Sequence, residues 1–163
     1  MSRILDRGAA RDWRAELRAR GARLVFTNGC FDLLHPGHID LLARARVLGD
    51  ALLVALNSDA SVRRAKGPKR PIVGEAERAE LVAGLRMVDA VTIFEEDTPA
   101  EIILALLPEV LVKGADWGED DIVGRDTVEA HGGRVVRLEL VPGLSTSAIV
   151  AAAQRGRFRL GGD

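Results

Sequence analysis

The chain has 163 residues, of which 47% are hydrophobic and 29% are charged, and its formal net charge is −1. This composition predicts a folded globular protein and excludes a largely disordered one. The apolar runs are too short to span a membrane, and the near-neutral charge gives no general attraction to nucleic acid. The single cysteine, Cys30, cannot form an internal disulfide. We therefore expect one cytoplasmic domain over residues 1–163, with its core at about 23–153, and neither a membrane nor a nucleic-acid partner.

The predicted elements alternate between strands and helices along the chain. Short apolar runs bounded by turn residues predict strands, and apolar residues at helical spacing predict helices. The strands are expected at 24–26, 51–56, 90–94, 110–112 and 134–140. The helices are expected at 11–20, 36–48, 75–85, 122–130 and 145–154. Another helix is expected to be capped by Thr98, with Pro99 at its first position and Glu101 three residues after the cap. Residues 63–71, which hold two prolines and several basic side chains, are expected to form a loop.

This alternation predicts an α/β fold with a five-stranded parallel sheet and helices on both faces. Such sheets bind ligands at the carboxyl ends of their strands. Polar clusters follow four of the expected strands: Thr27-Asn28-Gly29, Asn57-Ser58-Asp59, the segment from Lys113 to Asp116, and the segment that contains Ser145 and Thr146. The sequence therefore predicts that these clusters meet at one edge of the sheet.

The sharpest motif is His35-Pro36-Gly37-His38, which begins a predicted helix directly after the first strand and its turn. Histidines three residues apart share one helix face, and a helix N-terminus offers free N–H groups that attract phosphate. Gly37 lets a ligand approach the backbone. The alternatives are a structural pair, with one histidine at the cap and one in the core, and a zinc site. The spacing of Cys30 and His35 matches no common zinc pattern.

The stretch from Gly29 to His38 resembles the signature of the HxGH nucleotidyltransferases, which include the cytidylyltransferases. Further segments resemble one family within them, the D-glycero-β-D-manno-heptose 1-phosphate adenylyltransferases. These segments are 54–59, Lys66-Gly67 with Arg70-Pro71, 94–99, 111–117 and 143–147. The resemblance implies a Rossmann-like nucleotidyltransferase fold. Because the sugar-kinase domain that often precedes this domain is missing, the chain resembles the stand-alone form of the family.

The resemblance also implies roles for individual residues. His35, His38 and Lys66 would be catalytic and bind the phosphates of the nucleotide. The nucleotide site would further use Thr27, Asn28, Gly29, Gly37, Lys113, Asp116, Ser145 and Thr146. The acceptor substrate would contact Asp32, Arg78 and Trp117.

Each of these roles has a structural alternative. Lys66 would otherwise be a solvated loop lysine, and Arg78 would form an ion pair with Glu75 on a helix surface. Asp32 would stabilise a turn, Trp117 would pack at the rim, and Ser145 would simply cap its helix. Cys30 is expected to be a small packed hydrophobe, and His131 a surface residue at a helix end.

The implied reaction is the transfer of AMP from ATP to a sugar 1-phosphate, giving an ADP-heptose for lipopolysaccharide synthesis and pyrophosphate. Mg²⁺ would arrive with ATP, held by its phosphates and by water rather than by a protein metal site. A homodimer is expected, as are a separate sugar kinase and a phosphatase in the pathway. Two alternatives stay open: a cytidylyltransferase that acts on a polyol phosphate such as glycerol 3-phosphate, and a non-catalytic nucleotide-binding subunit.

Overall fold

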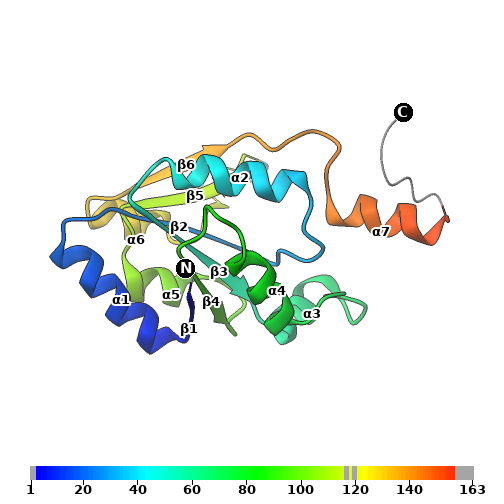
Figure 1. The fold of residues 1–163 in the computed structure, drawn as a ribbon, viewed down its shortest axis with the longest axis horizontal. Coiled ribbons are helices and arrows are strands. Elements are labelled where there is room, and N and C mark those ends of the chain that lie inside the picture. The colour runs from blue at the N-terminus through cyan, green and yellow to red at the C-terminus, as the bar shows by residue number, and fades with distance from the viewer. Residues whose placement is uncertain (1–2, 116–117, 119–120, 157–163) are drawn as a thin grey trace.

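The computed structural model describes residues 3–115, 118 and 121–156, which contain one parallel sheet of six strands (Figure 1). The sheet order is β1-β4-β3-β2-β5-β6, and every neighbouring pair is parallel. The strands are β1 (Arg3–Leu5), β2 (Leu24–Gly29), β3 (Ala51–Asn57), β4 (Ala90–Phe94), β5 (Val110–Gly114) and β6 (Arg134–Leu138). The α/β prediction is confirmed, and all five expected strands are present. The sixth, the edge strand β1, is too short for its sequence to show a periodicity.

Seven helices connect or flank these strands in the described part of the chain. They are α1 (Arg7–Ala19), α2 (Pro36–Arg46), α3 (Asp59–Lys66), α4 (Glu75–Ala83), α5 (Ala100–Leu106), α6 (Arg125–Ala130) and α7 (Thr146–Gln154). Figure 1 shows α7 lying apart from the sheet, and none of its residues is buried. The other helices cover the sheet.

Each face of the sheet carries its own hydrophobic core. Alternate residues of one strand point to opposite faces, so Leu24 and Phe26 lie in one core and Val25 in the other. The first core is completed by buried side chains of α1, α5 and α6, and the second by those of α2 and α4. Because both faces are covered, β3 is apolar from its first residue to its sixth.

The strand order reverses its direction at β2. The chain leaves β2 through α2 to β3 on one side, whereas β5 pairs with β2 on the other side. Such a reversal leaves a crevice at the carboxyl ends of the two neighbouring strands, where no crossover helix fills the space. The topology therefore predicts a ligand site at the carboxyl ends of β2 and β5.

Three local predictions are wrong. Residues 63–66, expected as part of a loop, belong to α3, which Ser58 caps by accepting from the Ser61 N–H at 3.1 Å. Thr98 does not cap α5: Pro99 takes that position without a side-chain hydrogen bond, and Glu101 accepts from Arg7 instead. The helix expected from residue 122 begins only at Arg125, after a left-handed Gly124.

Within the described residues, no helix is long and apolar enough to cross a membrane.

Candidate active site

A cavity of about 590 Å³ opens at the carboxyl ends of β2, β3 and β5, where the reversal of the strand order puts it. Segments far apart in the sequence line it. Eight of the predicted site residues contribute: Thr27, Asn28, Gly29, Asp32, His38, Lys66, Lys113 and Thr146. The cavity therefore brings together residues from five separate segments of the chain.

Two histidines cap the N-terminus of α2. Nδ1 of His35 accepts from the Gly37 N–H at 3.1 Å, and Nδ1 of His38 accepts from the His35 N–H at 3.3 Å. The two rings stack with their centroids 3.8 Å apart. Only His38 lines the cavity, while His35 lies behind it as the helix cap.

These hydrogen bonds fix where each imidazole carries its proton. A neutral ring that accepts at Nδ1 holds its proton on Nε2, which is then a donor. Burial, with smaller contributions from the nearby His35 and Lys66, lowers the pKa of His38 to about 4. Burial also lowers the pKa of His35. Both rings are thus neutral near pH 7 with the proton on Nε2, and the ring that lines the cavity is that of His38.

A side chain at Gly37 would crowd the His35 ring. A Cβ at this position would lie 3.0 Å from Nδ1 and Cε1 of His35 and 3.5 Å from Cβ of Leu144. The glycine of the motif therefore lets the His35 ring fold back over the first turn of α2.

The seam between β2 and β5 is held by two side chains. Thr27 Oγ1 donates to the Val112 carbonyl at 3.0 Å, and Lys113 Nζ donates to Asn28 Oδ1. Both pairs join the ends of neighbouring strands across the reversal. Lys113 brings a nearly buried positive charge to the cavity wall.

Asp32 connects three segments around the cavity. Its Oδ2 accepts from Arg70 Nε and from the Ile72 N–H, and its Oδ1 accepts from the Val73 N–H. Burial raises the pKa of Asp32, but these three donors outweigh it and leave the pKa below its ordinary value. The Asp32 carbonyl also accepts from Thr146 Oγ1 at 2.7 Å, which ties the start of α7 to the same loop.

The backbone on either side of Asp32 is strained. Phe31 and Leu33 have φ angles of 49° and 48°, in the left-handed region that bulky residues rarely enter. Residues in such conformations cluster at functional sites, where surrounding contacts hold them. Here the two left-handed residues flank Asp32, and the Asp32 carboxylate faces the segment that follows α3.

Arg78 does not line the cavity. Its side chain is fully buried and donates to the carbonyls of Cys30, Asn57 and Val73 and to Asp59 Oδ1, all within 3.0 Å. The alternative of a surface ion pair with Glu75 is therefore wrong. Arg78 instead joins the ends of β2 and β3 to the loop before α4.

Lys66 lies in the last turn of α3 and not in a loop, and its exposed side chain reaches the cavity. Ser145 caps α7 by accepting from the Ala148 N–H at 3.1 Å, but it does not line the cavity. Asp116 and Trp117 lie outside the described residues. Arg70, which our sequence analysis named only as part of a family segment, also lines the cavity.

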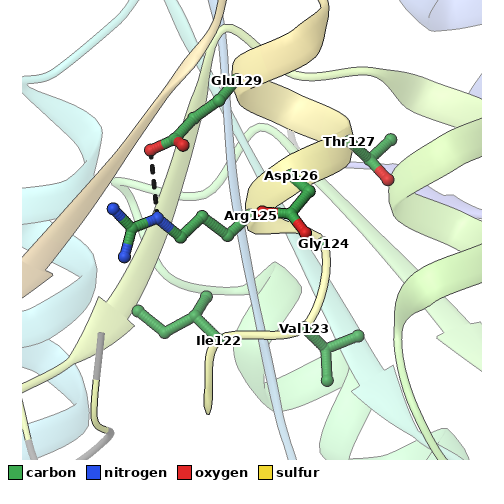
Figure 2. A pocket seen from close by; sticks show the side chains of 7 residues that line it. All are labelled: Ile122, Val123, Gly124, Arg125, Asp126, Thr127 and Glu129. Carbon is green, nitrogen blue, oxygen red and sulfur yellow. Dashed lines mark hydrogen bonds and ion pairs between the residues drawn. The ribbon is translucent and has the colours of Figure 1, made fainter. Parts of the chain in front are cut away.

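A second hollow, of about 580 Å³, lies beside α6 (Figure 2). Its lining is one continuous segment, residues 122–129. Arg125 forms an ion pair with Glu129 one turn further along the helix, as Figure 2 shows. No predicted site residue takes part in this hollow.

Among the described residues, no three His, Cys, Asp or Glu side chains are grouped so that they could hold a metal ion. The two carboxylates that line the cavity already have partners: Asp32 has the three donors described above, and Asp97 pairs with Arg64 at 2.6 Å. The described residues thus offer no protein cage for Mg²⁺.

Comparison with known proteins gives this site a context. The model of the cytidylyltransferase-like family matches residues 26–152. The bifunctional protein HldE of Azorhizobium caulinodans is 56% identical over 140 residues, which are 86% of this chain and 29% of that protein. The chain spans less than a third of the length of the curated relatives it matches first.

Two solved structures extend the comparison. A lipopolysaccharide core biosynthesis protein from Thermoplasma volcanium is 29% identical, has a TM-score of 0.65, and aligns over 74% of this chain and 99% of its own. Pantoate-beta-alanine ligase from Francisella tularensis, solved with beta-gamma ATP and beta-alanine, has a TM-score of 0.57 at 13% identity. That alignment covers 94% of this chain and 77% of the ligase, and it shows the fold alone.

The parallel sheet with its reversed strand order and its flanking helices defines a Rossmann-like α/β fold. The chain belongs to the cytidylyltransferase-like family.

Proposed function

We propose that the chain transfers AMP from ATP to a sugar 1-phosphate. The acceptor we propose is D-glycero-β-D-manno-heptose 1-phosphate, and the products are ADP-heptose and pyrophosphate. The observation that carries the proposal is the His38 imidazole: it is neutral, its Nε2 proton is available, and it lines a cavity at the ends of β2 and β5. The 56% identity to a bifunctional HldE protein supports the choice of acceptor over glycerol 3-phosphate.

In this reaction an oxygen of the sugar 1-phosphate attacks the α-phosphorus of ATP. A new P–O bond forms there, while the bond from the α-phosphorus to the bridging oxygen breaks and pyrophosphate leaves with the electron pair. The nucleophile is already an anion near pH 7, so no strong general base is needed. Catalysis then consists of holding the two substrates in line and stabilising the charge of the transition state.

The residues of the cavity suit these two tasks. His38 would donate a hydrogen bond from its Nε2–H to a phosphate oxygen, and His35 would hold the His38 ring through stacking and the helix cap. Lys66 would supply positive charge from the end of α3, and Lys113 from the end of β5. Thr27, Asn28 and Gly29 would shape the wall beside the nucleotide, and Thr146 the wall near the start of α7.

The remaining partners follow from the same chemistry. Mg²⁺ would accompany ATP and neutralise part of its phosphate charge. The acceptor must come from a sugar kinase or an equivalent phosphorylating step, with a phosphatase acting in the same pathway. We also propose a single nucleotidyltransferase domain, which the one continuous sheet of the described residues supports. We further propose that the chain forms a homodimer.

The test is pyrophosphate release, measured with ATP, CTP, GTP and UTP against a panel of sugar 1-phosphates and glycerol 3-phosphate. We expect the highest kcat/KM with ATP and the heptose 1-phosphate. A clear preference for CTP with glycerol 3-phosphate would overturn the substrate assignment. Nucleotide binding without turnover on any acceptor would indicate a non-catalytic subunit.

A further inference from the structure

Arg70 is held in the cavity wall through the buried carboxylate of Asp32. Its Nε donates to Asp32 Oδ2 at 2.9 Å, and its side chain is only 15% exposed. The next residues of the same segment, Ile72 and Val73, donate their backbone N–H groups to the same carboxylate, at 2.9 and 3.0 Å. One buried carboxylate therefore fixes both the guanidinium and the main chain that carries it.

The terminal nitrogens of Arg70 remain available. A guanidinium has five N–H donors, of which Asp32 takes one. Within the described part of the chain, Nη1 and Nη2 of Arg70 have no hydrogen-bond partner. The Asp32 charge is shared between Arg70 and two backbone N–H groups, so it does not fully offset the Arg70 charge. A largely buried cation with available donors lowers its free energy by binding an anion.

Two other arginines near the cavity show how different this arrangement is. Arg78 donates hydrogen bonds to three carbonyls and to Asp59, and it does not line the cavity. Arg64 is half exposed and is bound to Asp97 and to the Glu95 carbonyl. Arg70 alone of these three lines the cavity, and there it joins Lys66 and Lys113.

We propose that Arg70 is a further substrate-binding residue, which contacts a phosphate group of a bound ligand through its Nη atoms, and that Asp32 positions it. The planar fork of arginine matches two phosphate oxygens, whereas a lysine would offer only a point charge. The proposal rests on the proposed function for its ligand: the phosphate belongs either to the nucleotide or to the sugar 1-phosphate. Asp32 then acts through Arg70 and does not contact the substrate.

The experiment measures binding by calorimetry, without turnover. Arg70→Gln and Arg70→Lys are compared with the wild type and with Lys69→Gln, a matched control at the neighbouring exposed residue that does not line the cavity. The probes are inorganic pyrophosphate, ATP with Mg²⁺, and the heptose 1-phosphate. Thermal unfolding of each variant confirms that it is folded.

We expect Arg70→Gln to weaken at least one phosphate probe by about ten- to a hundredfold, the range for a charge-assisted hydrogen bond. Arg70→Lys should restore only part of this loss, and Lys69→Gln should stay within about twofold of the wild type. A loss confined to ATP and pyrophosphate assigns Arg70 to the nucleotide, and a loss confined to the sugar 1-phosphate assigns it to the acceptor.

Wild-type affinity of folded Arg70→Gln for all three probes would overturn the proposal, as would equal losses in Arg70→Gln and Lys69→Gln. So would a wild type that binds none of the probes. The proposed function fails in a different way, through anion binding that leads to no pyrophosphate release with any acceptor.

Asp32→Asn tests the positioning role. The amide keeps the shape of the carboxylate but cannot accept from all three donors. We expect it to weaken the same probe that Arg70→Gln weakens, with little further loss when both substitutions are combined. Independent, multiplicative losses would show that Asp32 does not act through Arg70.

Discussion

Two hollows of nearly equal volume, among those in the described part of the chain, differ in the residues that line them. The cavity at the strand ends measures about 590 Å³ and the hollow beside α6 about 580 Å³. The first collects side chains from β2, α2, α3, β5 and the start of α7, whereas the second is made by residues 122–129 alone. The volume of a hollow therefore does not show which of the two is a functional site.

The difference lies in what the sheet brings together. At the reversal between β2 and β5, polar residues from distant segments converge, among them a neutral histidine and three cations. Beside α6 the one arginine is paired with Glu129 on its own helix, as Figure 2 shows. Donors and positive charges that converge from several segments stabilise the charge that develops on a transferring phosphate, and the hollow beside α6 lacks such convergence. The predictions below test this contrast in order of expected effect.

The largest effect is expected from the motif histidines. His38→Ala removes an N–H donor that we place against the transferring phosphate, and His35→Ala removes the ring that supports it. Each should lower kcat by roughly 10²–10³-fold with a much smaller effect on the unfolding midpoint. His131→Ala, at the exposed end of α6, is the control and should leave kcat unchanged. Near-normal turnover in His38→Ala would mean that the cavity at the strand ends is no better a candidate for the active site than the hollow beside α6.

Lys66 and Lys69 form the next pair. Lys66→Ala takes a positive charge from the cavity wall and should lower kcat/KM by about tenfold or more. Lys69→Ala should have little effect, because its side chain is exposed and lies outside the cavity. Steady-state kinetics at fixed ionic strength measures both. Equal losses would mean that the basic segment acts only through its overall charge.

Gly37→Ala tests how closely the motif must be packed. The added Cβ would meet the His35 ring at 3.0 Å, so the ring must move by a few tenths of an ångström. We expect kcat to fall by about tenfold, because small displacements of a catalytic group are costly. Gly8→Ala in α1 adds the same methyl group at ordinary contact distance, 3.4 Å from Asp6, and should leave kcat unchanged. If both variants turn over like the wild type, the His35 position is not tightly fixed.

A pH dependence of stability should follow from His38. Its pKa in the folded protein is lowered to about 4, against an ordinary value of 6.5. Between these values the unfolded chain binds a proton that the folded chain does not, so the free energy of unfolding falls as the pH is lowered through this range. Urea unfolding at about pH 7 and about pH 4.5 should show a larger loss for the wild type than for His38→Ala. Parallel losses in the two proteins would contradict the pKa of His38.

The smallest effect is expected in the hollow beside α6. Thr127→Ala removes a lining hydroxyl there, and we expect kcat and KM to remain within about twofold of the wild type. The same assay that detects the loss in His38→Ala measures it. A large loss in Thr127→Ala would show that this hollow also contributes to function.

Local patterns made the framework of the site predictable. The buried strands β2, β3 and β5 begin with continuous apolar runs, and the polar residues that follow these runs form the last residues of the strands. The motif at 35–38 indicated a phosphate site before any geometry was known. The capping role of both histidines depends on ring orientations, which spacing alone does not specify.

The parts that could not be predicted depend on contacts between distant segments. The burial of Arg78 could not be predicted, because its helix gives no sign that carbonyls of Cys30, Asn57 and Val73 surround its guanidinium. Helix α3 was missed because Val62 is its only large apolar residue, so it shows no helical periodicity. Arg70 was not singled out because its position depends on Asp32, 38 residues earlier.

The placement of α7 has a consequence for its amide protons. None of its residues is buried, and its first turn is held by the Ser145 cap and the Thr146 hydrogen bond to Asp32. Opening this helix exposes little apolar surface and leaves the two cores intact, so it requires far less free energy than unfolding the sheet. The amides of residues 148–154 will therefore exchange with deuterium through local opening, whereas those of β2 and β3 will exchange only through global unfolding.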